Sequence, residues 1–364
     1  MGDLSRALFV GLFAALLAGC VPAELSVHDG HVVIPRAEGY FITDLATGQT
    51  KKLLAPRDGD EAAFAVYSPD GSQVLALERG ADGDSRDVFS LRTIDVATGK
   101  ARSIGVWNNV TYARWAPDGQ SASLTVFSSK KRGDVDIRLP ELFVVDPKTG
   151  RGKSLARNVS GLHRWLPDAK RIVVFQADSR KQNGLYLGHL VQIDPATGST
   201  QKLAAVAAFE KLFFDVSPDG QYIIFTAVAA DKVGEKLRFL ERKPSVFRLH
   251  IPSRTVTDTF SRKVVYARYA PDGKHTLIVT SGSNNHRTQL WIGAANLHSV
   301  IEIADDAVTK VDGQAAYASW VDNDTIIYFA AAPGARKPHL VRINIDGTDR
   351  ADLQADIDAA ASKS

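Results

Sequence analysis

Side chains able to bind an anion recur at one position of the chain, each directly before a large or branched apolar residue. Arg114, Arg164 and Arg268 share this position, Asp215 occupies it in another copy, and His163 precedes Arg164. Guanidinium groups bind carboxylates and phosphates through paired hydrogen bonds, and a charge among buried neighbours is costly unless it is paired or hydrated. The pattern therefore predicts one of two arrangements. Either the arginines, with His163, form an anion-binding cluster, or Asp215 bridges Arg164 or Arg268 as part of the structure.

Two kinds of turn recur in alternation and define that position. A Pro-Asp-Gly turn stands at residues 69–71, 117–119, 218–220 and 271–273, with weaker forms at 28–30, 167–169 and 321–323. The second motif is an Asp followed three residues later by Thr-Gly. It stands at 44–48, 95–99, 146–150 and 194–198, with degenerate forms at 250–254, 294–297 and 344–347. Proline fixes φ, aspartate bonds backbone amides two residues ahead and glycine accepts positive φ, so each motif reverses the chain.

The runs between these turns are rich in β-branched and aromatic residues, such as residues 222–225 and 142–145. Each repeat therefore predicts strand, turn, strand, longer loop, strand, turn and strand, which is a four-stranded antiparallel blade. Such a blade has two apolar faces, so several blades must stack and close into a ring. A row of bulky residues two positions before each Pro position is expected to fill the core between blades: Tyr67, Trp115, Trp165, Val216, Tyr269 and Trp320.

The alternation of turns resembles the WD40-like PD40 repeat of TolB-type propellers over residues 25–353. The resemblance implies an all-β fold, a β-propeller of seven four-stranded blades. Six or eight blades stay open because the first repeat is short. We predict a propeller over residues 28–353 and a tail over 354–364. The separate N-terminal domain of TolB has no counterpart, so the role of TolB is not carried over.

The first residues read as an export signal. Arg6 is followed by an apolar run of twelve residues, which is too short to span a bilayer, and the run closes on Leu-Ala-Gly-Cys at residues 17–20. This tetrapeptide resembles the lipobox of bacterial lipoproteins. The resemblance implies a signal peptide over residues 1–19, acyl chains such as palmitate on Cys20 and a tether over residues 20–27. Val21, where a retention signal would place Asp, favours the outer membrane facing the periplasm, and the cell surface remains open.

The loops between the second and third strands of the blades are long and mostly basic. Five of them sum to about +7, against +3 for the whole chain. Loops held by a rigid scaffold commonly carry recognition, so this face predicts an acidic partner: an envelope protein, an anionic polysaccharide or lipid headgroups. The candidate residues are Lys130, Lys131, Arg132, Arg138, Arg180, Lys181, Lys232, Lys236, Arg238, Phe239, Arg242, Lys243, Arg287, Arg336 and Lys337.

Composition and motifs narrow the function classes. The weak net charge does not suggest nucleic-acid binding, and the single cysteine excludes a disulfide within the chain. Nucleophile-elbow, zinc-protease, P-loop and Rossmann signatures are absent, so no catalytic residue, metal or cofactor is predicted. Asp82, Asp84 and Asp87 could ligate calcium, but their spacing lacks the Gly and the terminal Glu of an EF-hand, so solvated side chains are predicted there.

Two hypotheses follow. The first is a monomeric, non-catalytic scaffold that is lipid-anchored in the cell envelope. The alternative is a carbohydrate-active or sugar-binding propeller, lyase-like, that uses an arginine-lined channel mouth.

Overall fold

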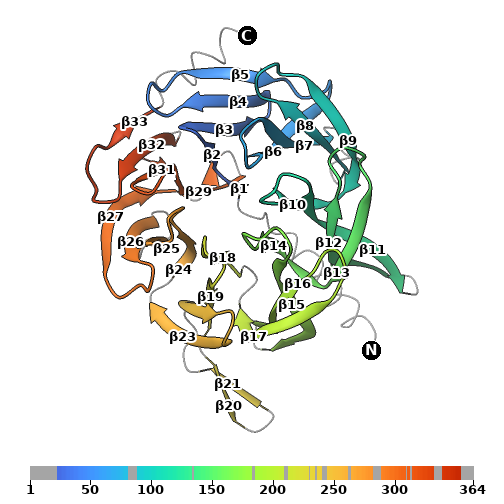
Figure 1. The fold of residues 1–364 in the computed structure, drawn as a ribbon, viewed down its shortest axis with the longest axis vertical. Helices are drawn as coiled ribbons and strands as arrows, with labels where there is room; N and C mark the ends of the chain where they lie inside the picture. The colour runs from blue at the N-terminus through green and yellow to red at the C-terminus, as the bar shows by residue number, and fades with distance from the viewer. Residues whose placement is uncertain are drawn as a thin grey trace, which may run out of the picture.

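Strands follow one another along the chain in groups of four, as the repeats predict. The computed structural model describes residues 23–80, 88–132, 135–182, 185–208, 212–228, 230–233, 236–239, 244–260, 264–281, 288–308, 310–311, 314–331 and 338–353. Within these residues the groups of strands stand in a ring around a common axis, and we call the inside of this ring the channel (Figure 1). The β-propeller is therefore confirmed, and the strand pairing gives seven blades.

Each blade is an antiparallel sheet whose strands run in sequence order from the channel outward. Blade 1 contains β2 (Ser26–His28), β3 (His31–Arg36), β4 (Gly39–Asp44) and β5 (Thr50–Leu54). Blade 2 contains β6 (Asp60–Tyr67), β7 (Gln73–Gly80), β8 (Val88–Asp95) and β9 (Ala101–Asn108). Blade 3 contains β10 (Val110–Trp115), β11 (Ala122–Arg132), β12 (Val135–Val145) and β13 (Gly152–Arg157). Blade 4 contains β14 (Val159–Trp165), β15 (Ile172–Gln182), β16 (Leu185–Ile193) and β17 (Thr200–Ala208).

The remaining blades keep this order with small variations. Blade 5 contains β18 (Phe214–Val216), β19 (Tyr222–Ala227), β22 (Ser245–His250) and β23 (Thr255–Phe260), and the hairpin of β20 (Ala230–Val233) and β21 (Lys236–Phe239) is inserted in it. Blade 6 contains β24 (Val264–Tyr269), β25 (His275–Ser281), β26 (Thr288–Ala294) and β27 (Val300–Ala307). Blade 7 contains β30 (Ser319–Trp320), β31 (Thr325–Ala330), β32 (His339–Asn344) and β33 (Ala351–Asp352), and one residue pair joins β27 to β31.

The recurrent turns have the geometry that their sequences predict. In the turn at residues 117–119, the Asp118 carboxylate accepts the backbone N–H of Gln120 at 2.9 Å, and Gly119 has a φ of 68°. The weaker copy at residues 167–169 forms the same turn, with Ala169 held at a φ of 56°. A left-handed conformation costs a residue with a Cβ roughly 1–2 kcal/mol. The surrounding blade therefore imposes the turn even where its glycine is missing.

The antiparallel order defines two faces of the ring. Both kinds of recurrent turn connect strands at one side, which we call the turn face. The connections between second and third strands, and those from one blade to the next, lie at the opposite side, which we call the loop face.

The side chains of the basic candidates fall outside the described residues. Those candidates are Lys130, Lys131, Arg132, Arg138, Arg180, Lys181, Lys232, Lys236, Arg238, Phe239, Arg242, Lys243, Arg287, Arg336 and Lys337.

The ring closes through the residues just before blade 1. The two-residue strand β1 (Ala23–Glu24) pairs in parallel with β29 (Gln314–Tyr317), which itself pairs with β28 (Lys310–Val311). Blades 1 and 7 also share a core in which Leu25 packs with Ile327 and Leu340. Residues 23–27, assigned to a tether from the sequence, are therefore strands and core of the ring, since the first blade takes its inner strand from them.

The rings before each turn are core, as the sequence predicts, whereas Val216 in the same row is only partly buried and packs against the core. Tyr67, Trp115, Trp165, Tyr269 and Trp320 are all 4–7% exposed. The indole N–H of Trp165 donates to the Ser123 hydroxyl of the preceding blade at 2.8 Å. Rings at this position therefore join neighbouring blades, and they place the preceding residue against the channel.

Candidate functional site

The three arginines of the inner strands converge on one carboxylate, that of Glu24. The Arg114 guanidinium donates to Glu24 Oε2 at 2.9 Å, Arg164 donates to Oε1, and Arg268 Nη1 lies 3.5 Å from Oε2. These arginines belong to β10, β14 and β24, and Glu24 comes from β1 inside the ring (Figure 1). The predicted cluster of guanidiniums therefore exists, and a residue of the same chain fills it.

Asp215 is the second carboxylate of this network. Its Oδ1 accepts the Nε–H of Arg164 at 3.0 Å, and its Oδ2 accepts the backbone N–H of Tyr269 at 3.1 Å. Arg268 Nε lies 4.0 Å from Oδ2. The bridge between Asp215 and Arg164 is the structural alternative that the sequence left open. We call Glu24, Arg114, Arg164, Asp215 and Arg268 the channel cluster.

His163 lies behind the channel cluster. Its ring nitrogens hydrogen bond to the Thr125 hydroxyl at 3.0 Å and the Ser123 hydroxyl at 2.6 Å, both in blade 3. Its ring meets the edge of Tyr112, whose hydroxyl accepts from Arg114 and Arg164. The ring nitrogens of His163 therefore bond to the neighbouring blade, and the imidazole supports the cluster through Tyr112.

Charge and burial oppose each other at Glu24. Burial alone would raise its pKa, but the charges of Arg164, Arg268 and Arg114 outweigh burial and hold the pKa well below its usual range. Burial also lowers the pKa of His163 to about 3, with the arginine charges acting in the same direction. At neutral pH the Glu24 carboxylate is therefore ionised, and the His163 imidazole behind the cluster is neutral.

The cluster borders an open part of the channel. Arg164 is 3% exposed at its side chain, whereas Arg114 and Arg268 are 27% and 21% exposed. Both line a cavity of about 280 Å³ together with Glu24, Tyr67 and Trp115. The network is therefore buried at Arg164 and partly exposed to solvent at Arg114 and Arg268.

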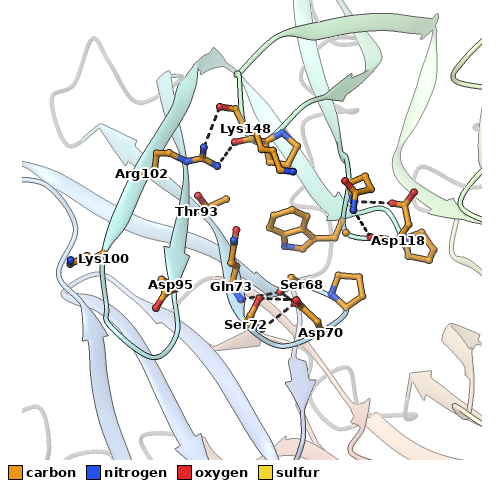
Figure 2. Close-up of a pocket in the computed structure, with 16 residues that line it drawn as sticks. Ser68, Asp70, Ser72, Gln73, Thr93, Asp95, Lys100, Arg102, Asp118 and Lys148 are labelled. Carbon is orange, nitrogen blue, oxygen red and sulfur yellow. Dashed lines mark hydrogen bonds between the residues drawn. The ribbon is translucent and has the colours of Figure 1, made fainter.

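A second hollow lies on the turn face between blades 2 and 3 (Figure 2). This groove has a volume of about 760 Å³ and holds both acidic and basic side chains. Asp70 accepts from Ser68 and Ser72, and Arg102 donates to the backbone carbonyls of Pro147 and Lys148 at 2.7 and 3.2 Å. The charged side chains of Asp70 and Arg102 in this groove therefore stabilise the turns at residues 69–71 and 146–150.

The described residues contain no group of three His, Asp or Glu side chains that could hold a metal ion. The acidic loop at 81–87 lies outside the described residues. No helix in the described part of the chain is long and apolar enough to cross a bilayer.

Glu24 is the site residue that the sequence analysis missed. Blade 1 was aligned on its turn at 28–30, which places Leu25 at the position of Arg114. The signal that could have found Glu24 was charge: three arginines against Asp215 leave a buried excess, and Glu24 is the only acidic residue between Cys20 and His28.

No protein-family model matches the chain, and no curated protein matches its sequence. Solved structures match its fold. TolB from Acinetobacter baumannii is 17% identical, with 88% of this chain and 77% of that chain covered and a TM-score of 0.52. The chain has the fold of a TolB-type β-propeller.

Solved structures of two enzymes also match the fold. An oligogalacturonate lyase from Vibrio parahaemolyticus is 11% identical over 89% of each chain, with a TM-score of 0.65. The acylaminoacyl peptidase of Pyrococcus horikoshii is 14% identical, with a TM-score of 0.63. There 96% of this chain matches 55% of that chain, so this chain spans about half of the peptidase. At these identities the likeness defines the fold and leaves the activity open.

Proposed function

We propose that this TolB-type propeller is a non-catalytic scaffold of the cell envelope. Lipid on Cys20 holds it to the periplasmic side of the outer membrane, and its basic loops bind an acidic partner. The observation that carries the proposal is the channel cluster, where the arginines available for chemistry are bonded to Glu24 and Asp215. The lipobox-like residues 17–20 support the anchor, and the sum of about +7 over five loops supports the acidic partner.

The anchor is tested by mass spectrometry of the protein purified from membranes. Wild type is expected to begin at Cys20 and to carry acyl chains, whereas Cys20→Ser is expected to lose both the acyl mass and the membrane fraction. A wild-type protein without acyl chains would contradict the anchor.

The partner is tested by crosslinking envelopes and recovering the propeller. Reversing Lys232, Lys236 and Lys243 to Glu is expected to remove crosslinked material that wild type retains. The matched control reverses three exposed lysines of the turn face, Lys100, Lys148 and Lys170. Equal recovery from both variants would contradict a role for the basic loops.

A sugar-binding or lyase-like function is the second candidate. It is favoured by the likeness to oligogalacturonate lyase and by the partial exposure of Arg114 and Arg268 in the channel cavity. Incubation with oligogalacturonate separates the two functions. Formation of unsaturated products, lost in Arg268→Gln, would replace the scaffold proposal with this one.

A further inference from the structure

The direction of the chain through the channel follows from the pairing of β1. Strand β29 runs toward β30 and the turn at residues 321–323, which is on the turn face. Because β1 pairs with β29 in parallel, with Ala23 opposite Ala316 and Glu24 opposite Tyr317, it runs the same way. The chain then continues through Leu25 into β2 and reaches the turn at residues 28–30. The upstream end of β1 therefore points toward the loop face.

Glu24 holds this segment in place. Its carboxylate is 8% exposed and is shared among arginines of blades 3, 4 and 6. Withdrawing β1 would leave three guanidiniums with Asp215 alone, and breaking a buried charge pair by removing one partner typically costs about 3–5 kcal/mol. The segment is therefore fixed at a point four residues after Cys20.

Covalent geometry limits where the lipid can be. Three peptide steps separate Cys20 from Ala23, and an extended chain covers at most about 3.6 Å per residue. Whatever conformation the intervening residues adopt, Cys20 lies within roughly 11 Å of the loop-face end of β1.

We infer that the loop face rests on the membrane that holds the lipid and that the turn face points away from it. The inference rests on the proposed lipid anchor. Anionic lipid headgroups are then the acidic partner of the loop face, because a tether this short brings that face to the headgroups. The turn face, with the groove between blades 2 and 3, is then the surface open to the aqueous compartment.

The test compares two labelling sites that flank β10 (Val110–Trp115) on opposite faces of the ring: Asn108 at the end of β9, and Gln120 after the turn that follows β10. Asn108 is exposed on the loop face and Gln120 is exposed on the turn face. Lipidated Asn108→Cys and Gln120→Cys are labelled with a fluorophore in phosphatidylethanolamine and phosphatidylglycerol vesicles that contain a headgroup-linked quencher. The label at Asn108→Cys is expected to be quenched more strongly. Equal or reversed quenching would overturn the inference.

A second arm separates this inference from the anchor itself. The mature chain made without lipid has a free thiol at Cys20, its only cysteine. Spin-label distances from Cys20 are measured to Asn108→Cys and to Gln120→Cys. Since β10 spans about 20 Å at roughly 3.3 Å per residue, the distance to Gln120→Cys is expected to be longer by on the order of 10 Å. A shorter distance to Gln120→Cys would overturn the exit at the loop face even if Cys20 proves to be lipidated.

Glu24→Gln is the matched perturbation. It is expected to broaden the Cys20 distance distribution, because the arginines lose their shared carboxylate. Glu61→Gln, which alters an exposed ion pair with Arg79, is expected to leave the distribution unchanged. A Glu24→Gln protein that folds and keeps the narrow distribution would contradict the role of Glu24 in fixing the segment. If this variant does not fold, the wild-type distances still decide the direction of exit.

Discussion

The channel cluster and the groove between blades 2 and 3 both gather charged side chains, but they join parts of the chain at different separations. In the groove, the carboxylates of Asp70 and Asp118 accept amides two residues ahead. In the channel, Arg164 bonds to Asp215 51 residues away and to Glu24 140 residues away. The groove carboxylates therefore stabilise local turns and Arg102 joins only two adjacent blades, whereas the channel charges connect blades 3 to 6 with β1.

Removing the centre of the channel cluster tests this difference most severely. Arg164→Gln leaves Glu24 and Asp215 with the two partly exposed arginines, and we expect a loss of about 3–5 kcal/mol in the free energy of unfolding. Arg102→Gln in the groove, where the guanidinium meets backbone carbonyls near solvent, is expected to cost less than about 1.5 kcal/mol. Urea unfolding at pH 7 measures both, and equal losses would remove the distinction.

Acid should weaken the channel cluster because the pKa of Glu24 is depressed in the fold. Its stabilisation is present above the unfolded pKa of about 4.5 and is lost as the pH falls toward the folded pKa. We expect Glu24→Gln to be about 3 kcal/mol less stable than wild type at pH 7. Below pH 4.5 this gap should narrow by up to about 1.4 kcal/mol per pH unit. A gap that is constant from pH 7 to pH 3.5 in urea unfolding would contradict the charge network.

His163 should contribute over a separate pH range. Its folded pKa of about 3 lies below the ordinary 6.5, so the unfolded chain binds a proton that the fold excludes as the pH falls between these values. Stability should fall with acid, and His163→Gln should reduce that slope by about 1.4 kcal/mol per pH unit near pH 5. Unfolding free energies at pH 6 and pH 5 provide the measurement, and identical slopes would show that the imidazole is not held neutral.

The smallest effect belongs to the local turns. Ala169→Gly relieves a φ of 56° and is expected to raise the stability by about 1 kcal/mol. Gly119→Ala, at a φ of 68° in the next turn upstream, is expected to lower it by a similar amount. Thermal unfolding measures both, and shifts of the same sign would contradict the shared turn geometry.

The sequence predicted what depends on neighbouring residues. The turns at 117–119 and 167–169, the antiparallel strands between them and the buried row that includes Trp115 and Trp165 follow from local residue types and their spacing. The arginine position on the channel also followed, because those residues directly precede the buried row.

The repeat pattern could not place Glu24, because the position of this residue depends on ring closure. Strand β1 has two residues and pairs with a strand almost 300 residues later, so it carries no periodic pattern. The partners of His163 were missed for a related reason: Ser123 and Thr125 belong to the neighbouring blade, and the inter-blade register is set by packing.

Glu24 is the anion that the arginine cluster binds, and a double-mutant cycle measures that interaction. The free energies of unfolding of wild type, Glu24→Gln, Arg164→Gln and the double variant give the coupling between the two side chains. We expect a coupling of about 1.5–3 kcal/mol at pH 7, because each charged group contributes most of its stabilisation through the other. Additive losses, with a coupling near zero, would show that Glu24 and Arg164 act independently and that Glu24 is not the anion of the cluster.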